Sequence, residues 1–305
     1  MDRVTTWCTS GYINDLFWFN EQTNVCNFAD DTTFHASDTD LSNVIWRLEN
    51  DSLIAIEWFE WNYMKLNEDK CHLIVAGNKH QHMWANVGSA KIRESHREKL
   101  LGIHIDRDLK FNYHISNLCV KAGRKLSALI RLYRYYNLDQ RRNLMKTFIE
   151  SQFSYSPMAW MFHDRRINNQ INKLHERALR IVYRDDTATF EELLKRDNSL
   201  RIHHRNIKKM AVEMYKCLHQ VGPSLLGDIF EKRKCGENSR ILRSNNDFLL
   251  PQVNTVHYGH DSLRYLGCKI WELIPSEIKT STDIETFKIK IKSWVPSSCP
   301  CRLCR

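Results

Sequence analysis

The sequence is poor in the two residues that most often interrupt regular structure, with only 10 Gly and 6 Pro among 305 residues. This scarcity excludes long disordered tracts and flexible linkers as a major part of the chain. No apolar run approaches the roughly 20 residues that a membrane helix needs, and no apolar leader follows Met1. We therefore expect a globular protein of the cytoplasm or nucleus, not secreted and with no membrane partner.

Acidic and basic residues are unevenly distributed along the chain. Residues 1–90 hold 5 Lys and Arg against 13 Asp and Glu, residues 91–166 hold 16 against 7, and residues 167–305 hold 24 against 16. An acidic first part and a basic remainder suit a metal-dependent site beside a surface that receives a phosphate backbone. Ordinary solvated helix faces would also explain the excess of Lys and Arg.

Seven of the ten cysteines occur singly, which is typical of free thiols in a reducing compartment. The other three, Cys299, Cys301 and Cys304, form a C-x-C-x-x-C pattern that suits one soft metal ion. A structural zinc site needs four ligands, so a fourth must come from elsewhere. The sequence offers Cys268, His257, His260 or a residue beyond the end; three free thiols on a flexible tail are the alternative.

Two adjacent carboxylates, Asp30 and Asp31, lie between two short β-prone stretches at residues 25–28 and 32–34. The pattern predicts a hairpin with the acids at its turn. Carboxylate oxygens are the ligands that Mg²⁺ prefers, and paired divalent metals promote phosphoryl transfer. An Asx-type turn, in which the acids accept only from backbone N–H groups, is the alternative.

The remainder of the first third predicts a helix over a small antiparallel sheet. Hydrophobic periodicity indicates a helix at about residues 41–63, followed by strands at 72–76, 82–87 and 99–105. We expect the first two strands to pair as a hairpin. Gly102, inside the third strand, indicates a bulge or a close approach of another backbone.

From residue 112 the periodicity becomes helical. Helices are predicted at about residues 112–133, 139–153, 168–183, 201–220 and 281–294, with a further one beginning at Asp261 or Ser262 and a short one opened by a capping box at Thr189. The first of these helices is amphipathic, and its polar side carries Lys121, Arg124, Lys125 and Arg131. The predicted fold class is therefore α+β and mostly helical.

Several of these patterns occur in an order that resembles a known family. FADD at residues 28–31 is followed by WNYMKLNEDK at 61–70 and LLGIHID at 100–106. This order resembles the reverse transcriptase (RNA-directed DNA polymerase) of non-LTR, LINE/jockey-like retrotransposons. The resemblance continues through HISNLCVKAGRKLSALIR, INKLHERALRIVYRD and SLRYLGCKIWELIPSEIK, and covers roughly residues 12–304.

The resemblance implies a partial polymerase palm at residues 1–110, a helical thumb at 111–220 and a C-terminal region at 221–305. Asp30 and Asp31 would hold Mg²⁺ or Mn²⁺ for two-metal nucleotidyl transfer to a primer 3′-hydroxyl. Lys70 would lie near the triphosphate of the incoming deoxynucleotide, where a cation offsets charge on the leaving pyrophosphate. A surface charge between a helix and a strand is the alternative for Lys70.

The resemblance also implies contacts with an RNA/DNA template–primer. Leu101 and Gly102 match the hairpin that holds the primer end. Contacts to phosphates that read no sequence would come from the amphipathic helix, through Lys121, Arg124, Lys125 and Arg131.

Part of the family pattern is missing. In the family a further catalytic Asp on a Phe-x-x-x-Asp strand, a glycine-rich segment and the fingers all precede the Asp-Asp turn. Only 27 residues precede Phe28 here, and they do not contain that strand. We therefore expect a C-terminal fragment of a transposable-element nucleotidyltransferase that is inactive alone. The alternatives are a non-catalytic nucleic-acid-binding protein derived from a mobile element, or a decayed element.

Overall fold

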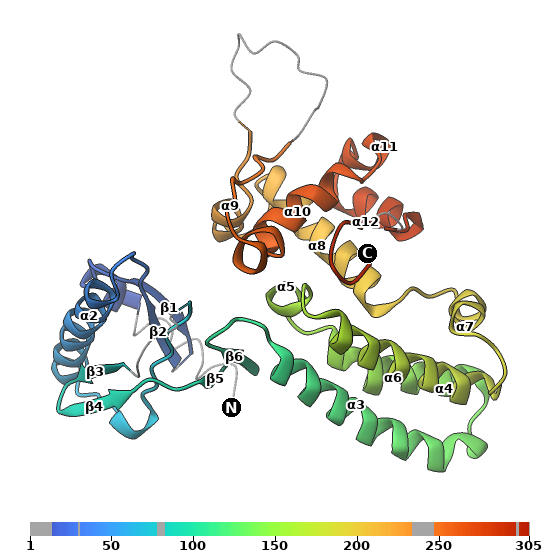
Figure 1. Ribbon diagram of the computed structural model, residues 1–305, viewed down its shortest axis with the longest axis horizontal. Coiled ribbons are helices and arrows are strands. Elements are labelled where there is room, and N and C mark those ends of the chain that lie inside the picture. Colours follow the sequence, from blue (N-terminus) through green and yellow to red (C-terminus); the bar gives the residue numbers. More distant parts are fainter. Residues whose placement is uncertain (1–13, 30, 78–82, 234–246, 297–298, 305) are drawn as a thin grey trace, which may run out of the picture. The chain divides into compact units, whose positions relative to one another are not determined.

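The computed structural model describes residues 14–29, 31–77, 83–233, 247–296 and 299–304 (Figure 1). The chain forms two compact units, residues 1–109 and 110–305. Helices make up 56% of the structure and the strands form small antiparallel sheets, so the predicted α+β, mostly helical class is confirmed. None of the described helices has both the length and the apolar character needed to cross a bilayer.

The described strands of the first unit form three antiparallel hairpins. They are β1 (Asn24–Phe28) with β2 (Asp31–His35), β3 (Trp84–Val87) with β4 (Ala90–Arg93), and β5 (Arg97–Leu100) with β6 (Ile103–Asp106). The first hairpin is the predicted one, and Phe28 pairs with Asp31 at its end. A short 3₁₀ segment, η1 (Asn14–Trp18), precedes β1, and a second one, η2 (Glu68–Lys70), precedes β3.

The predicted hairpin of residues 72–76 with 82–87 is wrong. Of the first stretch, only Leu73 takes part in a strand-like contact, an isolated bridge to Glu94. β3 pairs instead with β4, which follows it directly. The local pairing is favoured because Gly88, with φ of 58°, permits a two-residue turn, whereas the predicted pairing closes a longer loop.

The predicted single strand at residues 99–105 is also wrong, because these residues belong to the β5–β6 hairpin. Its turn consists of Leu101 and Gly102, with φ of 46° and 86°. A two-residue turn with positive φ at both positions is typical of tight hairpins and explains the glycine without a bulge.

One helix, α2 (Leu41–Trp61), positions the first hairpin. Asp40 caps the helix by accepting from Ser42 N at 3.0 Å. The fully buried Asp51 lies in the middle of the helix, and its Oδ2 accepts from the backbone of Gln22 at 3.2 Å and of Thr23 at 2.7 Å. This carboxylate therefore fixes the chain that leads into β1.

The second unit is helical. Its longer helices are α3 (Asn112–Leu132), α6 (Arg165–Tyr183), α7 (Phe190–Asp197), α8 (Ile202–Leu218), α10 (Leu263–Glu272) and α12 (Ile284–Ser293). Its shorter segments are η3 (Tyr133–Tyr135), α5 (Pro157–Trp160), α9 (Leu225–Ile229), η6 (Val256–His260) and α11 (Ser276–Lys279). The predicted helix 139–153 is wrong as a continuous element, since it divides into α4 (Leu138–Leu144), the π-helical η4 (Met145–Ile149) and the 3₁₀ segment η5 (Glu150–Phe153).

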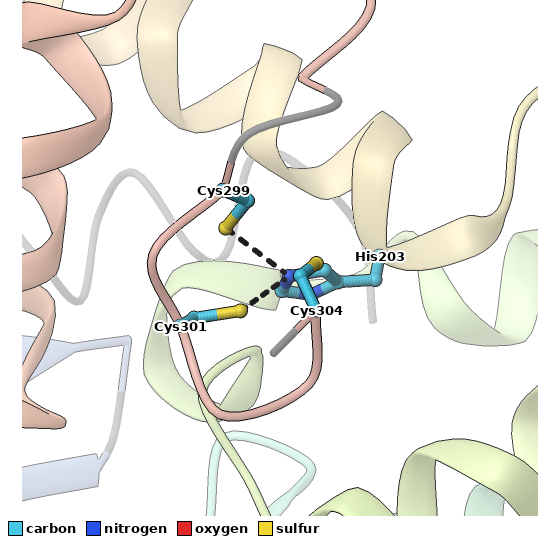
Figure 2. Close-up of side chains that lie close together, drawn as sticks. All are labelled: His203, Cys299, Cys301 and Cys304. Carbon is cyan, nitrogen blue, oxygen red and sulfur yellow. Dashed lines mark hydrogen bonds between the residues drawn. The ribbon is translucent and has the colours of Figure 1, made fainter.

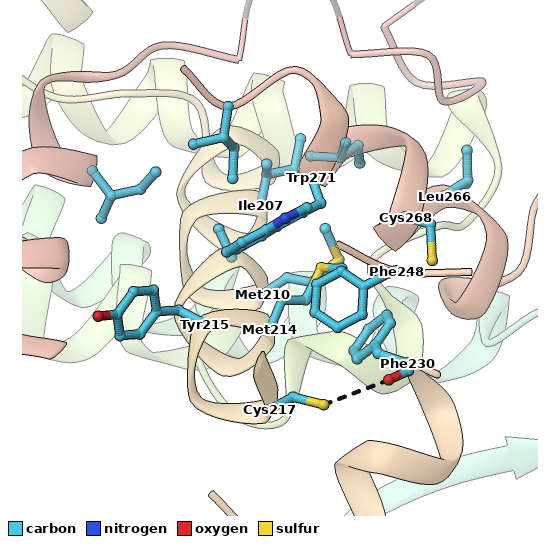
Figure 3. Packing of buried hydrophobic residues seen from close by; sticks show 14 of the residues in the cluster. Ile207, Met210, Met214, Tyr215, Cys217, Phe230, Phe248, Leu266, Cys268 and Trp271 are labelled. Carbon is cyan, nitrogen blue, oxygen red and sulfur yellow. Dashed lines mark hydrogen bonds between the residues drawn. The ribbon is translucent and has the colours of Figure 1, made fainter. Parts of the chain in front are cut away.

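Two apolar cores stabilise this unit. The first lies among α3, η4, α6 and α7, and includes the fully buried Ile115, Met145 and Leu179. The second surrounds α8, with Met210, Met214 and Trp271 at its centre (Figure 3). Because α8 packs against α6, α10 and α12, it connects the two cores.

Candidate functional site

The predicted catalytic turn is at the end of the β1–β2 hairpin. Asp31 is the first residue of β2 and is exposed. Its cross-strand neighbour Phe28 is also exposed, and Ala29 has a positive φ of 58°. Asp30 lies outside the described residues. The hairpin therefore presents the Asp31 carboxylate to solvent, where an oxygen-preferring cation can reach it.

The other predicted polymerase residues of the first unit also lie on its surface. Lys70 ends the 3₁₀ segment η2 and is exposed. Leu101 and Gly102 form the exposed tip of the β5–β6 hairpin. No described residue of the β1–β2 hairpin, of η2 or of the β5–β6 hairpin is buried, so each of these elements is accessible to a ligand.

The predicted phosphate-binding residues lie on α3. Ala122, Leu126 and Leu129 are buried on one side of the helix. On the other side of the helix lie three exposed cations, Lys121, Arg124 and Arg131, and the half-buried Lys125. Within the described part of the chain, none of these four side chains forms an ion pair. Uncompensated cations along one helix face attract a polyanion.

The three C-terminal cysteines converge on a histidine from α8. His203 is the second residue of that helix, and Cys299, Cys301 and Cys304 come from the last described segment of the chain (Figure 2). His203, Cys299 and Cys301 are buried, whereas Cys304 is exposed. The side chains point toward one another, and one donor atom from each residue lies within 4.8 Å of the other three.

The distances suit a tetrahedral metal site. His203 Nε2 lies 3.2 Å from Cys301 Sγ and 4.0 Å from Cys299 Sγ. Zn–S bonds of about 2.3 Å and Zn–N bonds of about 2.0 Å place tetrahedral ligand atoms roughly 3.5–3.8 Å apart. The four residues could therefore bind a metal such as zinc after movements of less than about 1 Å.

The contacts among the three thiols shift their pKa values in opposite directions. Contacts from the Cys299 and Cys304 thiols, and then from His203, hold the pKa of Cys301 well below its usual range despite its burial. The same contact with Cys301 raises the pKa of Cys299 above its usual range. Because the thiolate is the form that binds metal, a divalent cation at this cluster would displace the protons that the cysteines hold.

Two neutral imidazoles lie near this cluster. Burial, followed by the neighbouring His203 and Arg201, lowers the pKa of His204 to about 4, and its Nε2 lies 3.8 Å from Cys304 Sγ. Burial also lowers the pKa of His163 to about 4. At neutral pH neither ring carries a positive charge that would repel a bound cation.

The three fourth-ligand candidates that the sequence offered within the chain, Cys268, His257 and His260, do not belong to the cluster. The cluster contains His203 instead. The Cys268 thiol instead lies on α10 and contacts the carbonyl of Leu249 at 3.6 Å. His203 is 98 residues from Cys301 along the chain, so no local spacing relates them. The adjacent pair His203-His204 at the start of a predicted helix was the only signal available.

Comparisons of this chain with protein-family models, with curated proteins and with solved structures found no match.

Proposed function

We propose that this chain is the C-terminal part of a retrotransposon RNA-directed DNA polymerase, and that it binds a template–primer but does not polymerise alone. The exposed Asp31 at a hairpin tip, the exposed Leu101-Gly102 turn and the cationic face of α3 support the proposal. All three features are exposed to solvent, as residues that contact a metal ion or a template–primer must be.

In the parent enzyme, the primer 3′-hydroxyl attacks the α-phosphorus of a deoxynucleoside triphosphate and pyrophosphate leaves. The chemistry of the donors suits magnesium or manganese, because Asp30 and Asp31 supply carboxylate oxygens. The bound metal would supply charge stabilisation for the transferred phosphoryl group. Lys70 would offset charge on the leaving pyrophosphate, and the cations of α3 would hold the nucleic-acid backbone.

The chain alone lacks part of this machinery. Within the 305 residues, no Phe-x-x-x-Asp sequence precedes the hairpin to supply a further carboxylate. Fewer carboxylates bind divalent metal more weakly, and catalysis by positioning tolerates little loss of geometry. We therefore assign these residues a binding role that becomes catalytic only with an upstream segment.

The unpaired cations of α3 carry the proposal, and their contribution to binding can be measured. Replacing Lys121, Arg124 and Arg131 by alanine should weaken binding of an RNA–DNA duplex. It should also lower the steepness of the salt dependence by about 2.7, because each lost phosphate contact removes about 0.9 from the slope of log K against log salt. Fluorescence anisotropy at several salt concentrations measures both quantities.

A matched control removes three lysines from α12, namely Lys288, Lys290 and Lys292. This variant has the same change in net charge and should bind with nearly the same slope as the unmodified chain. Equal loss of slope in the two variants would show that binding follows net charge rather than the face of α3, and would contradict the proposal.

A non-catalytic nucleic-acid-binding protein derived from a mobile element is the second candidate. The unpaired cations of α3 favour this candidate as well, because they need no metal to bind phosphate. The two candidates differ at the hairpin tip. Only the polymerase requires the carboxylates of Asp30 and Asp31.

A further inference from the structure

We propose that His203, Cys299, Cys301 and Cys304 hold one structural Zn²⁺ ion, which fastens the C-terminal segment 299–304 to the first turn of α8. The site is independent of the proposed polymerase function, since none of its ligands belongs to the hairpin tips or to the cationic face of α3. Thiolate and imidazole donors in a tetrahedral arrangement select zinc over the hard cations Mg²⁺ and Ca²⁺.

The ligand set is that of a structural site. Four protein donors complete a tetrahedral shell, whereas a catalytic zinc keeps one position open for water or substrate. Three of the four residues are also buried, so only the side of Cys304 faces solvent. The ion would therefore act by holding chain segments together and would have no direct access to a substrate.

The two segments that the ion would join differ in their regular structure. The segment 299–304 contains no helix or strand, and one backbone hydrogen bond, from Cys304 N to Cys301 O at 3.2 Å, closes its turn. His203, in contrast, belongs to a helix that is anchored in both cores. Two residues later Arg205 binds the buried Glu150, and Ile207 is fully buried in the core around α8.

The ion would close a very long loop. Cys299 and Cys301 are 96 and 98 residues from His203 along the chain. A cross-link over a loop of this length restricts the unfolded chain more than a short one does. Zinc binding should therefore be coupled to folding of the region from α8 to the C-terminus, because the unfolded chain does not hold these four donors together.

Zinc content of the full chain, purified with a reducing agent, tests the proposal. Native mass spectrometry should find one Zn²⁺ per chain. In competition with a chelator of known affinity, His203→Ala should bind zinc more than about 100-fold more weakly, since even an outer-shell partner contributes up to that factor. Cobalt substitution should give a thiolate-to-cobalt charge-transfer band that weakens in Cys301→Ser.

Two neighbouring histidines provide matched controls. His204 Nε2 lies 3.8 Å from Cys304 Sγ, and His257 lines the same pocket as Cys301. His204→Ala and His257→Ala should keep one zinc ion with an affinity within a few-fold of the unmodified chain. If either control loses zinc while His203→Ala keeps it, the assignment of His203 is wrong.

A further variant separates loss of a ligand from loss of folding. His203→Cys restores four donors and should bind one zinc ion even if His203→Ala does not fold. Failure of His203→Cys to bind zinc would overturn the proposal. So would unmodified protein that carries no zinc, or that gives it up to a weak chelator, or in which mass spectrometry finds the three thiols joined in disulfides.

Discussion

Replacing Glu150 by alanine is expected to destabilise the second unit by about 3–5 kcal/mol, because the change leaves the half-buried Arg205 guanidinium and the buried His175 ring without their partner. Glu150 is buried on η5. It accepts a hydrogen bond from His175 Nε2 of α6 at 3.1 Å and forms an ion pair with Arg205 of α8. One carboxylate thus connects three segments of the unit.

The loss of stability caused by this substitution should depend on pH, because the pKa values of Glu150 and His175 are both shifted in the folded chain. Burial opposes ionisation of Glu150, but hydrogen bonds from His175 and Arg205 outweigh it and lower its pKa from 4.5 to about 2. The stabilisation is fully present above pH 4.5 and is lost as the pH falls toward 2. Burial also lowers the pKa of His175 from 6.5, so the unfolded chain takes up a proton first and stability begins to fall below pH 6.5.

Urea unfolding followed by circular dichroism, at pH 7 and at pH 4, measures both effects. The difference between the unmodified chain and Glu150→Ala should shrink at the lower pH. Glu176→Ala is the control, because Glu176 forms a partly exposed ion pair with Arg180 one turn along α6, which contributes less than about 1 kcal/mol. If Glu150→Ala is no more costly than Glu176→Ala, the buried network does not stabilise this unit.

Replacing Trp271 by alanine should cost about 3–5 kcal/mol, the range for large buried aromatic residues. The ring is 1% exposed at the centre of the core around α8 (Figure 3). It meets Phe248 edge-on at 5.5 Å between centroids and lies stacked 6.0 Å from Phe287. Its Nε1 donates to Asp247 Oδ2 at 2.7 Å, so the substitution removes both packing and a charge-assisted hydrogen bond.

Two variants separate these contributions in the same unfolding experiment. Trp271→Phe keeps an aromatic ring in the core but removes the hydrogen bond to Asp247, so it should cost less than Trp271→Ala. Trp46→Ala removes an indole that is 57% exposed on α2 and should change stability by less than about 0.5 kcal/mol. A cost below about 1 kcal/mol for Trp271→Ala would contradict the packing of this core.

Helix termini were predictable from the sequence because their signals are local. The capping box at Thr189 forms as predicted, with Glu192 N donating to Thr189 Oγ1 at 3.3 Å and Thr189 N donating to the Glu192 carboxylate at 2.8 Å. Ser262 likewise caps α10 through Tyr265 N. These contacts span three residues, so residue type and spacing determine them.

Pairings between distant segments were not predictable in the same way. The periodicity of residues 72–76 fits a strand, but it does not say which partner is nearest, and the Gly88 turn gives β3 a closer one. His203 has no spacing relation to the C-terminal cysteines, since the fold of about 100 intervening residues brings them together. Asp51 lies within the predicted helix at residues 41–63, and nothing in that local pattern indicates that its side chain is buried and binds the backbone before β1.

Primer extension tests most directly whether Asp30 and Asp31 belong to a polymerase site. We expect no incorporation by the 305-residue chain alone on a primed RNA template with Mg²⁺ or Mn²⁺. Supplied with a polymerase segment that carries the Phe-x-x-x-Asp strand and the fingers, the chain should extend the primer. Asp30→Asn or Asp31→Asn should then abolish extension, whereas Asp38→Asn, at an exposed carboxylate paired with Arg47, should retain it. Extension by the complemented Asp31→Asn chain at the rate of the unmodified chain would contradict a polymerase role for the hairpin.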